Sequence, residues 1–265
     1  MLRIAGFARL NGITFIGPKY QVTATHTGKG IIIKQKRVPK LFSFAAWPKK
    51  VPLLRGMWTF IEMLAHMVIS GSKKAKTAFA ALFLLGAYVE FWPKAEKIPV
   101  PKSSTLITEN ILILGNLLMM VVLIWALQGL FRYHAAEHMA INAYLSGKNL
   151  NLENIRESSR ISSRCGTNLV VILYLIQIIL IGFLHLHFFV YLDVLFTFAI
   201  AYEIFRLQLK PFIWLGTLAQ KHIVTRKPEN YHLIIGGMGL ESLISLEETG
   251  EFPKQYTMKE HLSSD

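Results

Sequence analysis

Four long apolar runs constrain this chain more than any other feature of its sequence. They cover about residues 77–92, 106–131, 168–185 and 188–205, in a chain of 265 residues of which 52% are hydrophobic. A helix that crosses a bilayer needs about 20 mainly apolar residues. We therefore interpret the runs as four membrane spans, the last two joined in a tight hairpin. The expected fold class is a mainly α, multi-pass helical membrane protein with a small N-terminal cytoplasmic β-hairpin unit.

The distribution of basic residues predicts how these spans are oriented. Four spans place both termini and the loop at 132–164 on one side, and that side carries 26 of the 29 lysine and arginine residues. Cytoplasmic loops are enriched in these residues, so we expect both termini in the cytoplasm. The net charge of +13 then favours the anionic inner leaflet of the lipid bilayer as a partner. Nucleic acid is not expected, because the basic residues are not interleaved with aromatic ones.

The rest of the chain divides around the apolar runs. Segments rich in Ile, Val and Thr flank the turn "HTGKG" at 26–30, a pattern typical of strands. The apolar spacing after Arg55 indicates an amphipathic helix. The expected parts are a small basic cytoplasmic β unit at 1–54, an interfacial helix at 55–76, a four-span bundle with its cytoplasmic loop at 77–209, and a cytoplasmic tail at 210–265.

The stretch "FRYHAAEHMA" at 131–140 contains the strongest chemical motif. On a helix, His134 and His138 lie one turn apart on one face, the spacing that a divalent metal uses. Glu137 lies beside the pair, where it would act as a base on a metal-bound water. The order H-x-x-E-H is that of the inverted zinc protease signature. The alternative is two interfacial histidines and a glutamate that binds headgroups or pairs with Arg132.

A catalytic zinc site needs a third protein ligand. Glu203, near the end of the fourth run, is the candidate by depth, and the alternative is a structural ion pair with Arg206 or Arg164. Cys165 is the only cysteine. It is either a soft metal ligand or nucleophile, or a packed and inert side chain.

Several strings resemble, in order and spacing, the YqhQ-type bacterial integral membrane proteins, a family of unknown function often described as predicted metal-dependent enzymes. They are "LRGMWTFIE", "FRYHAAEHMAINAY", "LNLENIR", "SRCGT", "AYEIFRL" and "LAQKHIVTRKPEN". The resemblance covers roughly residues 7–245 and implies a bacterial cytoplasmic membrane. By spacing alone, Glu153 and Arg156 would simply pair on a helix surface. The site that the resemblance implies consists of His134, Glu137, His138, Glu153, Arg156, Arg164, Cys165 and Glu203.

The sequence also departs from the family pattern. The family's amino-terminal motif resembles G-G-Q-A-V-I-E-G-V-M-M-R-G-P, whereas this chain has "GFARLNGITFIGP", with Asn11 in place of the acid and Ile16 in place of the arginine. Leu145 replaces an acid, and Ser162 replaces a histidine near "RCGT". If Ser162 stands where a third ligand was, the metal site is incomplete.

Two functions from different classes follow. The first is a metal-dependent hydrolase at the cytoplasmic membrane face, acting on a lipid headgroup or a membrane-anchored peptide. It would use Zn²⁺ or another divalent metal on His134 and His138 with Glu203, Glu137 to activate water, and Arg164 to hold an anionic group. The second is a non-catalytic scaffold or regulator of other membrane proteins, in their insertion or quality control. It needs no cofactor, and its partners would be other membrane proteins or a second copy of the chain.

Overall fold

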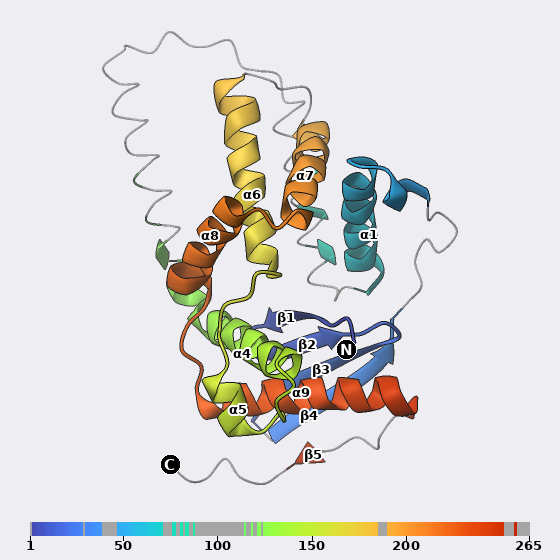
Figure 1. Ribbon diagram of the computed structural model, residues 1–265, viewed down its shortest axis with the longest axis vertical. Helices are drawn as coiled ribbons and strands as arrows, with labels where there is room; N and C mark the ends of the chain where they lie inside the picture. The colour runs from blue at the N-terminus through green and yellow to red at the C-terminus, as the bar shows by residue number, and fades with distance from the viewer. Residues whose placement is uncertain are drawn as a thin grey trace. The chain divides into compact units, whose positions relative to one another are not determined.

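The computed structural model divides the chain into two compact units. Unit 1 comprises Met1–Pro39, Leu118–Cys165 and Thr217–Asp265, and unit 2 comprises Lys40–Leu117 and Gly166–Gly216. Figure 1 shows the elements of both units. The described residues are 2–28, 30–38, 47–70, 76–77, 80–81, 83–84, 87, 114, 118, 121–122, 124–184, 190–251 and 257–258.

Unit 1 is built on an antiparallel sheet with the strand order β1-β2-β3-β4-β5. The first four strands pair as neighbours in the order in which they follow one another along the chain, with turns at 10–11 and 17–19 and a third connection after Thr27. The expected small β unit is therefore present, with one strand earlier and one far later in the chain than the sequence indicated. The strands are β1 Ala5–Arg9, β2 Gly12–Ile16, β3 Tyr20–Thr27, β4 Gly30–Arg37 and β5 Thr257–Met258.

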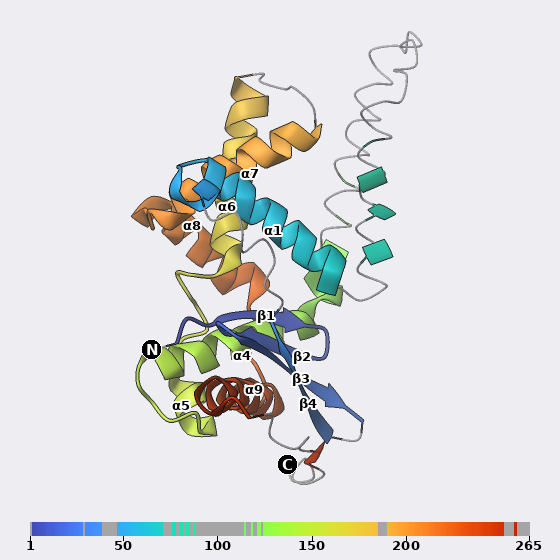
Figure 2. The same cartoon turned by 90° about the vertical axis from the view of Figure 1, so that its right-hand side faces the viewer.

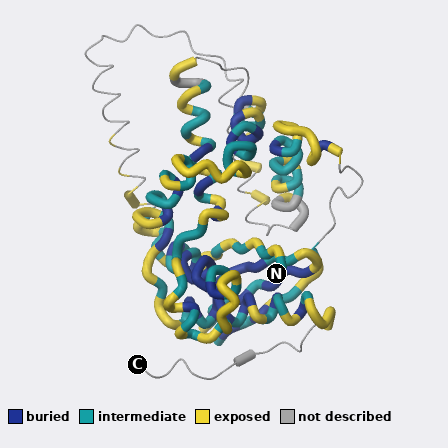
Figure 3. Tube along the Cα trace, viewed as in Figure 1, coloured by how far each residue is buried: buried dark blue, intermediate teal, exposed yellow. Residues whose placement is uncertain are grey.

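One face of this sheet is apolar and buried. Ile13 of β2 lies opposite Ala24 of β3, which in turn lies opposite Ile33 of β4, so the three form one row across the sheet. Residues directly opposite each other in an antiparallel pair share a face, and Phe15 with Val22 forms the next row. Helices α4 (Gln128–Leu145) and α9 (Asn230–Thr249) cover this face, as Figure 2 shows. Buried residues gather where these helices meet the strands (Figure 3).

Close packing joins α4 to α9. A Cβ atom added to Gly236 of α9 would lie 3.1 Å from the carbonyl oxygen of Ala136 in α4, so a small residue lets the two backbones approach. Gly239 faces Ala24 and Phe15 in the same way. These glycines do not interrupt α9, which is one continuous helix of 20 residues.

Unit 2 contains helices that pack through their apolar faces. Phe60 of α1 contacts Phe198 of α7 with ring centroids 4.8 Å apart, and Gly56 of α1 lies against the backbone of Ala199. The elements of this unit are η1 Trp47–Lys50, α1 Leu54–Ser70, α6 Gly166–Gln177, the π-helical turn η2 Ile178–Phe183, α7 Val190–Arg206 and most of α8 Lys210–Ala219. Unit 1 further contains α5 Leu152–Glu157 and the π-helical turn η3 Gln220–Val224.

The prediction of a multi-pass membrane protein with four spans is wrong. Among the residues that the structure describes, no helix combines the length and the apolarity needed to cross a membrane. In the third predicted span α6 has 12 residues and continues directly into the six-residue π-helical turn η2, and in the fourth α7 has 17 residues.

The first two predicted spans, at 77–92 and 106–131, fall largely outside the described residues. The predicted location in a bacterial cytoplasmic membrane, with cytoplasmic termini, depended on four spans and is contradicted with them.

Candidate metal centre

Helix α4 presents two histidines side by side. His134 and His138 are one turn apart, and their ring centroids lie 4.4 Å from each other. The i, i+4 spacing creates this arrangement locally, because 3.6 residues complete one turn. His138 is buried and His134 is half-buried.

Backbone carbonyl groups fix the orientation of both rings. His134 Nδ1 lies 2.9 Å from the carbonyl oxygen of Val224, and His138 Nδ1 lies 2.7 Å from that of Arg160. A carbonyl oxygen only accepts hydrogen bonds, so each Nδ1 donates its proton and each Nε2 keeps its lone pair. Histidines that ligate metals are commonly held in this way by a partner on the other nitrogen.

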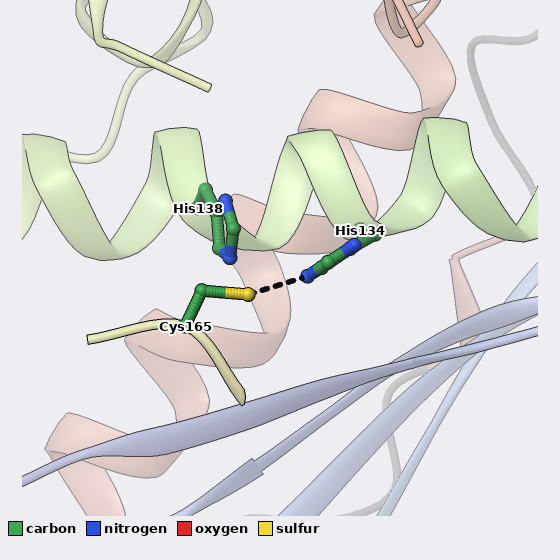
Figure 4. Close-up of side chains that lie close together, drawn as sticks. All are labelled: His134, His138 and Cys165. Atoms are coloured by element: carbon green, nitrogen blue, oxygen red, sulfur yellow. Dashed lines mark hydrogen bonds between the residues drawn. The ribbon is translucent and has the colours of Figure 1, made fainter. Parts of the chain in front are cut away.

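Cys165 completes the group. Its Sγ lies 3.3 Å from Nε2 of His134, and Figure 4 shows the thiol between the two imidazoles. The preceding loop is held by a reciprocal pair: the Ser162 N–H donates to Oε1 of Gln220 at 2.9 Å, and Nε2 of Gln220 donates to the Ser162 carbonyl at 3.0 Å. Gln220 is fully buried, so the loop that carries the cysteine is anchored inside unit 1.

The donor set fits a divalent metal. One ligand atom from each of His134, His138 and Cys165 lies within 4.8 Å of the other two. Tetrahedral zinc, with Zn–S about 2.3 Å and Zn–N about 2.0 Å, separates sulfur and nitrogen ligands by about 3.5 Å. The 3.3 Å between Cys165 and His134 is close to that value. Three protein ligands leave a fourth position for water or substrate, as in catalytic zinc sites.

Burial keeps both histidines neutral. Desolvation lowers the pKa of His134, against the opposing effect of the Val224 carbonyl. It lowers the pKa of His138 to about 4, with a further contribution from the nearby His134 and an opposing one from the Arg160 carbonyl. Neutral imidazole is the form that binds metal, so these side chains lose no proton on ligation at pH 7.

Glu137 lies on the neighbouring face of α4 and is not in the ligand group. It packs against Gly6 of β1, where an added Cβ would be 2.7 Å from its Oε1 atom. The residue is only 5% exposed, and its Oε2 is buried with no hydrogen-bond partner among the described residues. Burial raises the pKa of the Glu137 carboxyl to about 8.

The other candidates lie elsewhere. Glu203 is in unit 2, where it accepts hydrogen bonds from Nε of Arg55 at 2.7 Å and from the Leu53 N–H at 3.0 Å. Its hydrogen-bonding partner is therefore Arg55, which lowers the pKa of its carboxyl. Arg206, one of the two arginines that the sequence suggested, acts on Glu203 only through its charge and lowers this pKa further. Arg164 is exposed in the loop just before Cys165.

Glu153 is exposed on α5, and Arg156 donates to Oδ1 of Asn230 at 2.8 Å. Arg132 pairs with Glu229 and not with Glu137.

Sequence reasoning missed the groups that orient the site. The Val224 and Arg160 carbonyls act through the backbone, so no side-chain pattern could reveal them. Gln220 lay within a motif used for the family resemblance, but nothing in its spacing connects it to Ser162, 58 residues away. Gly6 belongs to an amino-terminal motif that departs from the family pattern.

The comparisons with known proteins agree with the motifs. Residues 77–245 match DUF1385, described as a protein of unknown function. The chain is 26% identical to the uncharacterized protein YqhQ of Bacillus subtilis (strain 168), over 63% of this chain and 64% of that protein. The match thus spans less than two thirds of that relative's length. No solved structure matches. The resemblance to the YqhQ-type family is confirmed, with this chain as a divergent member.

Proposed function

We propose that this chain, which belongs to the DUF1385 family of proteins of unknown function, is a metal-dependent hydrolase. The ligands are His134, His138 and Cys165, and zinc is the first candidate ion. The observation that carries the proposal is the convergence of three ligand atoms within 4.8 Å of one another. Both imidazoles are already held in the tautomer that ligation needs.

The chemistry of a three-ligand divalent metal suits hydrolysis, because the ion acts as a Lewis acid and lowers the pKa of a bound water. The chain's own residues prepare the site. The Val224 and Arg160 carbonyls hold the rings of His134 and His138. The loop before Cys165 is anchored by the two hydrogen bonds between Ser162 and Gln220.

Glu137 is the acid–base candidate. Buried polar atoms are almost always hydrogen-bonded, and an orphan is costly unless it serves another purpose. Oε2 of Glu137 is such an orphan within the described part of the chain. It belongs to the residue that directly precedes His138 on α4, on the face that packs against Gly6 of β1.

Metal content per chain tests the ligand set. The protein is purified without chelator or nickel resin, and metal is measured by mass spectrometry for the wild type, His134→Ala and Cys165→Ser. We expect near one equivalent in the wild type and a loss in both variants. His222→Ala is the matched control, because His222 is exposed on η3 and outside the ligand group.

A spectroscopic measurement separates ligation from a folding defect. The wild type loaded with Co²⁺ should show a thiolate-to-cobalt charge-transfer band that Cys165→Ser lacks while it keeps its far-ultraviolet circular dichroism. Glu137→Gln should keep the metal and lose hydrolysis of an activated ester. Absence of metal from the wild type, or full occupancy in His134→Ala, would refute the proposal.

A further inference from the structure

A cavity of about 450 Å³ lies in unit 1 beside the ligand group. Its walls come from α4, from the segment around α5 and from the start of α9. Arg160 connects it to the candidate metal centre, because this residue lines the cavity while its carbonyl oxygen accepts the hydrogen bond from His138. Met139, which directly follows His138, also lines it. Small-molecule sites have volumes of about 300–1,000 Å³.

The cavity is positively charged. Arg156, Arg160 and Lys227 line it, and none of them belongs to an ion pair within the described residues. Three cations gathered around one opening repel one another and favour an anion between them.

The nearby acids do not neutralise these cations. Glu157 pairs with Lys148, and Glu229 pairs with Arg132. Glu153 points from the exposed surface of α5 and does not line the cavity. The cavity therefore keeps an excess of positive charge.

Polar groups add directional contacts. Arg156 donates to Oδ1 of Asn230 at 2.8 Å, which holds its guanidinium at the cavity wall. Ser158 also lines the cavity, but its hydroxyl donates to the Asn154 carbonyl at 2.8 Å. An arginine fork and an amide are groups that bind phosphate oxygens.

Part of the wall is apolar. Met139 and Leu233 also line the cavity, and both belong to the core cluster of unit 1. The volume also exceeds what a single inorganic anion fills. The occupant therefore needs an anionic end for the cations and an organic part for this wall.

We propose that this cavity binds a small organic phosphate. Binding itself goes beyond the proposed function and does not require a metal. The assignment of that phosphate as part of the hydrolase substrate rests on the proposed function, since the cavity and the ligand group share Arg160 and adjoining residues of α4.

Isothermal titration of the full chain with phenyl phosphate and with inorganic phosphate tests the proposal. Both the metal-loaded protein and protein dialysed against a chelator are titrated. The variants are Arg156→Gln, Lys227→Gln and the two combined. Lys36→Gln is the matched control, because Lys36 is exposed on β4 and does not line the cavity. Circular dichroism confirms that each variant is folded.

We expect each single substitution to weaken phenyl phosphate binding about fivefold and the pair to weaken it about 20-fold, as exposed charge-assisted contacts do. Lys36→Gln should bind as the wild type does. Phenyl phosphate should bind more tightly than inorganic phosphate, because Met139 and Leu233 make part of the cavity wall apolar. Equal affinities for the two probes would overturn the organic part of the proposal.

The two preparations distinguish failure of this proposal from failure of the proposed function. Binding that survives the chelator and is lost in the Arg156 and Lys227 variants supports the cavity, even if no metal is ever found. Binding that disappears with the chelator and is unchanged in those variants overturns the cavity and leaves the metal centre standing. No detectable binding of either probe at millimolar concentration overturns it as well.

Discussion

Replacing Glu137 by glutamine should change how stability depends on pH. The carboxyl is 5% exposed, faces Gly6 of β1, and has one oxygen without a partner among the described residues. Burial raises its pKa from 4.5 to about 8. The unfolded chain thus releases a proton near pH 4.5 that the folded chain keeps until about pH 8.

The sign follows from this difference in bound protons. The folded state binds the proton more tightly than the unfolded state does. The stabilisation of the folded state by protonated Glu137 is therefore complete below pH 4.5 and is lost as the pH rises to about 8. Between pH 5 and pH 8 the wild type should lose about 3–4 kcal/mol of unfolding free energy through this group, from about 1.4 kcal/mol per unit of pKa difference. The glutamine variant has no such titration. Its unmet amide N–H groups cost roughly 1–3 kcal/mol, but that cost is the same at every pH.

The assay is urea unfolding of chelator-dialysed protein, followed by circular dichroism at pH 5, 6, 7 and 8. We expect the unfolding free energy of Glu137→Gln, relative to that of the wild type, to rise by about 3–4 kcal/mol from pH 5 to pH 8. The buried histidines have lowered pKa values and act in the opposite direction, but both proteins contain them, so the difference cancels their effect. For the control Glu241→Gln, at an exposed position of α9, the difference in unfolding free energy from the wild type should not change with pH. A difference that does not change with pH for Glu137→Gln as well would refute the reasoning.

Two further substitutions test the surroundings of the site. Gly6→Ala places a Cβ within 2.8 Å of three atoms of Glu137 and should lower the unfolding free energy by about 1–3 kcal/mol in urea titrations; the control Gly129→Ala, where an added Cβ meets nothing within 4 Å, should not destabilise. Glu203→Gln should lower the melting temperature by breaking the pair with Arg55 and leave the metal content unchanged. Loss of metal from this variant would show that Glu203 is a ligand after all.

The sequence could predict what one helix decides by itself. The spacing of His134 and His138 indicated one helical face, and α4 brings their rings to 4.4 Å. Cys165 was a candidate ligand, but its alternative as an inert packed residue stayed open. Nothing local to residue 165 says that its loop folds back to α4, because that contact is set by Gln220 and by the packing of unit 1.

The apolar runs misled because composition does not say what covers an apolar surface. In α7, Phe198, Ala199 and Ala201 are buried inside unit 2, and Phe60 of α1 packs on Phe198. A hydrophobic helix in a protein core and one in a bilayer have similar residues, so the apolar runs alone could not separate the two. The two histidines could thus be placed from the sequence, whereas their surroundings could not.

The departure at Ser162 has a different meaning once the loop is seen. If a histidine there had been a metal ligand, its loss would have left the site incomplete. Ser162 instead contributes its backbone N–H and carbonyl to Gln220, and these bonds do not depend on the side chain. The third candidate ligand atom comes from Cys165, three residues later, whose own N–H lies 3.3 Å from the Ser162 carbonyl. The Ser162 hydroxyl accepts the Arg164 N–H at 3.3 Å within the same turn, and the candidate ligand group of His134, His138 and Cys165 comes together without a histidine at this position.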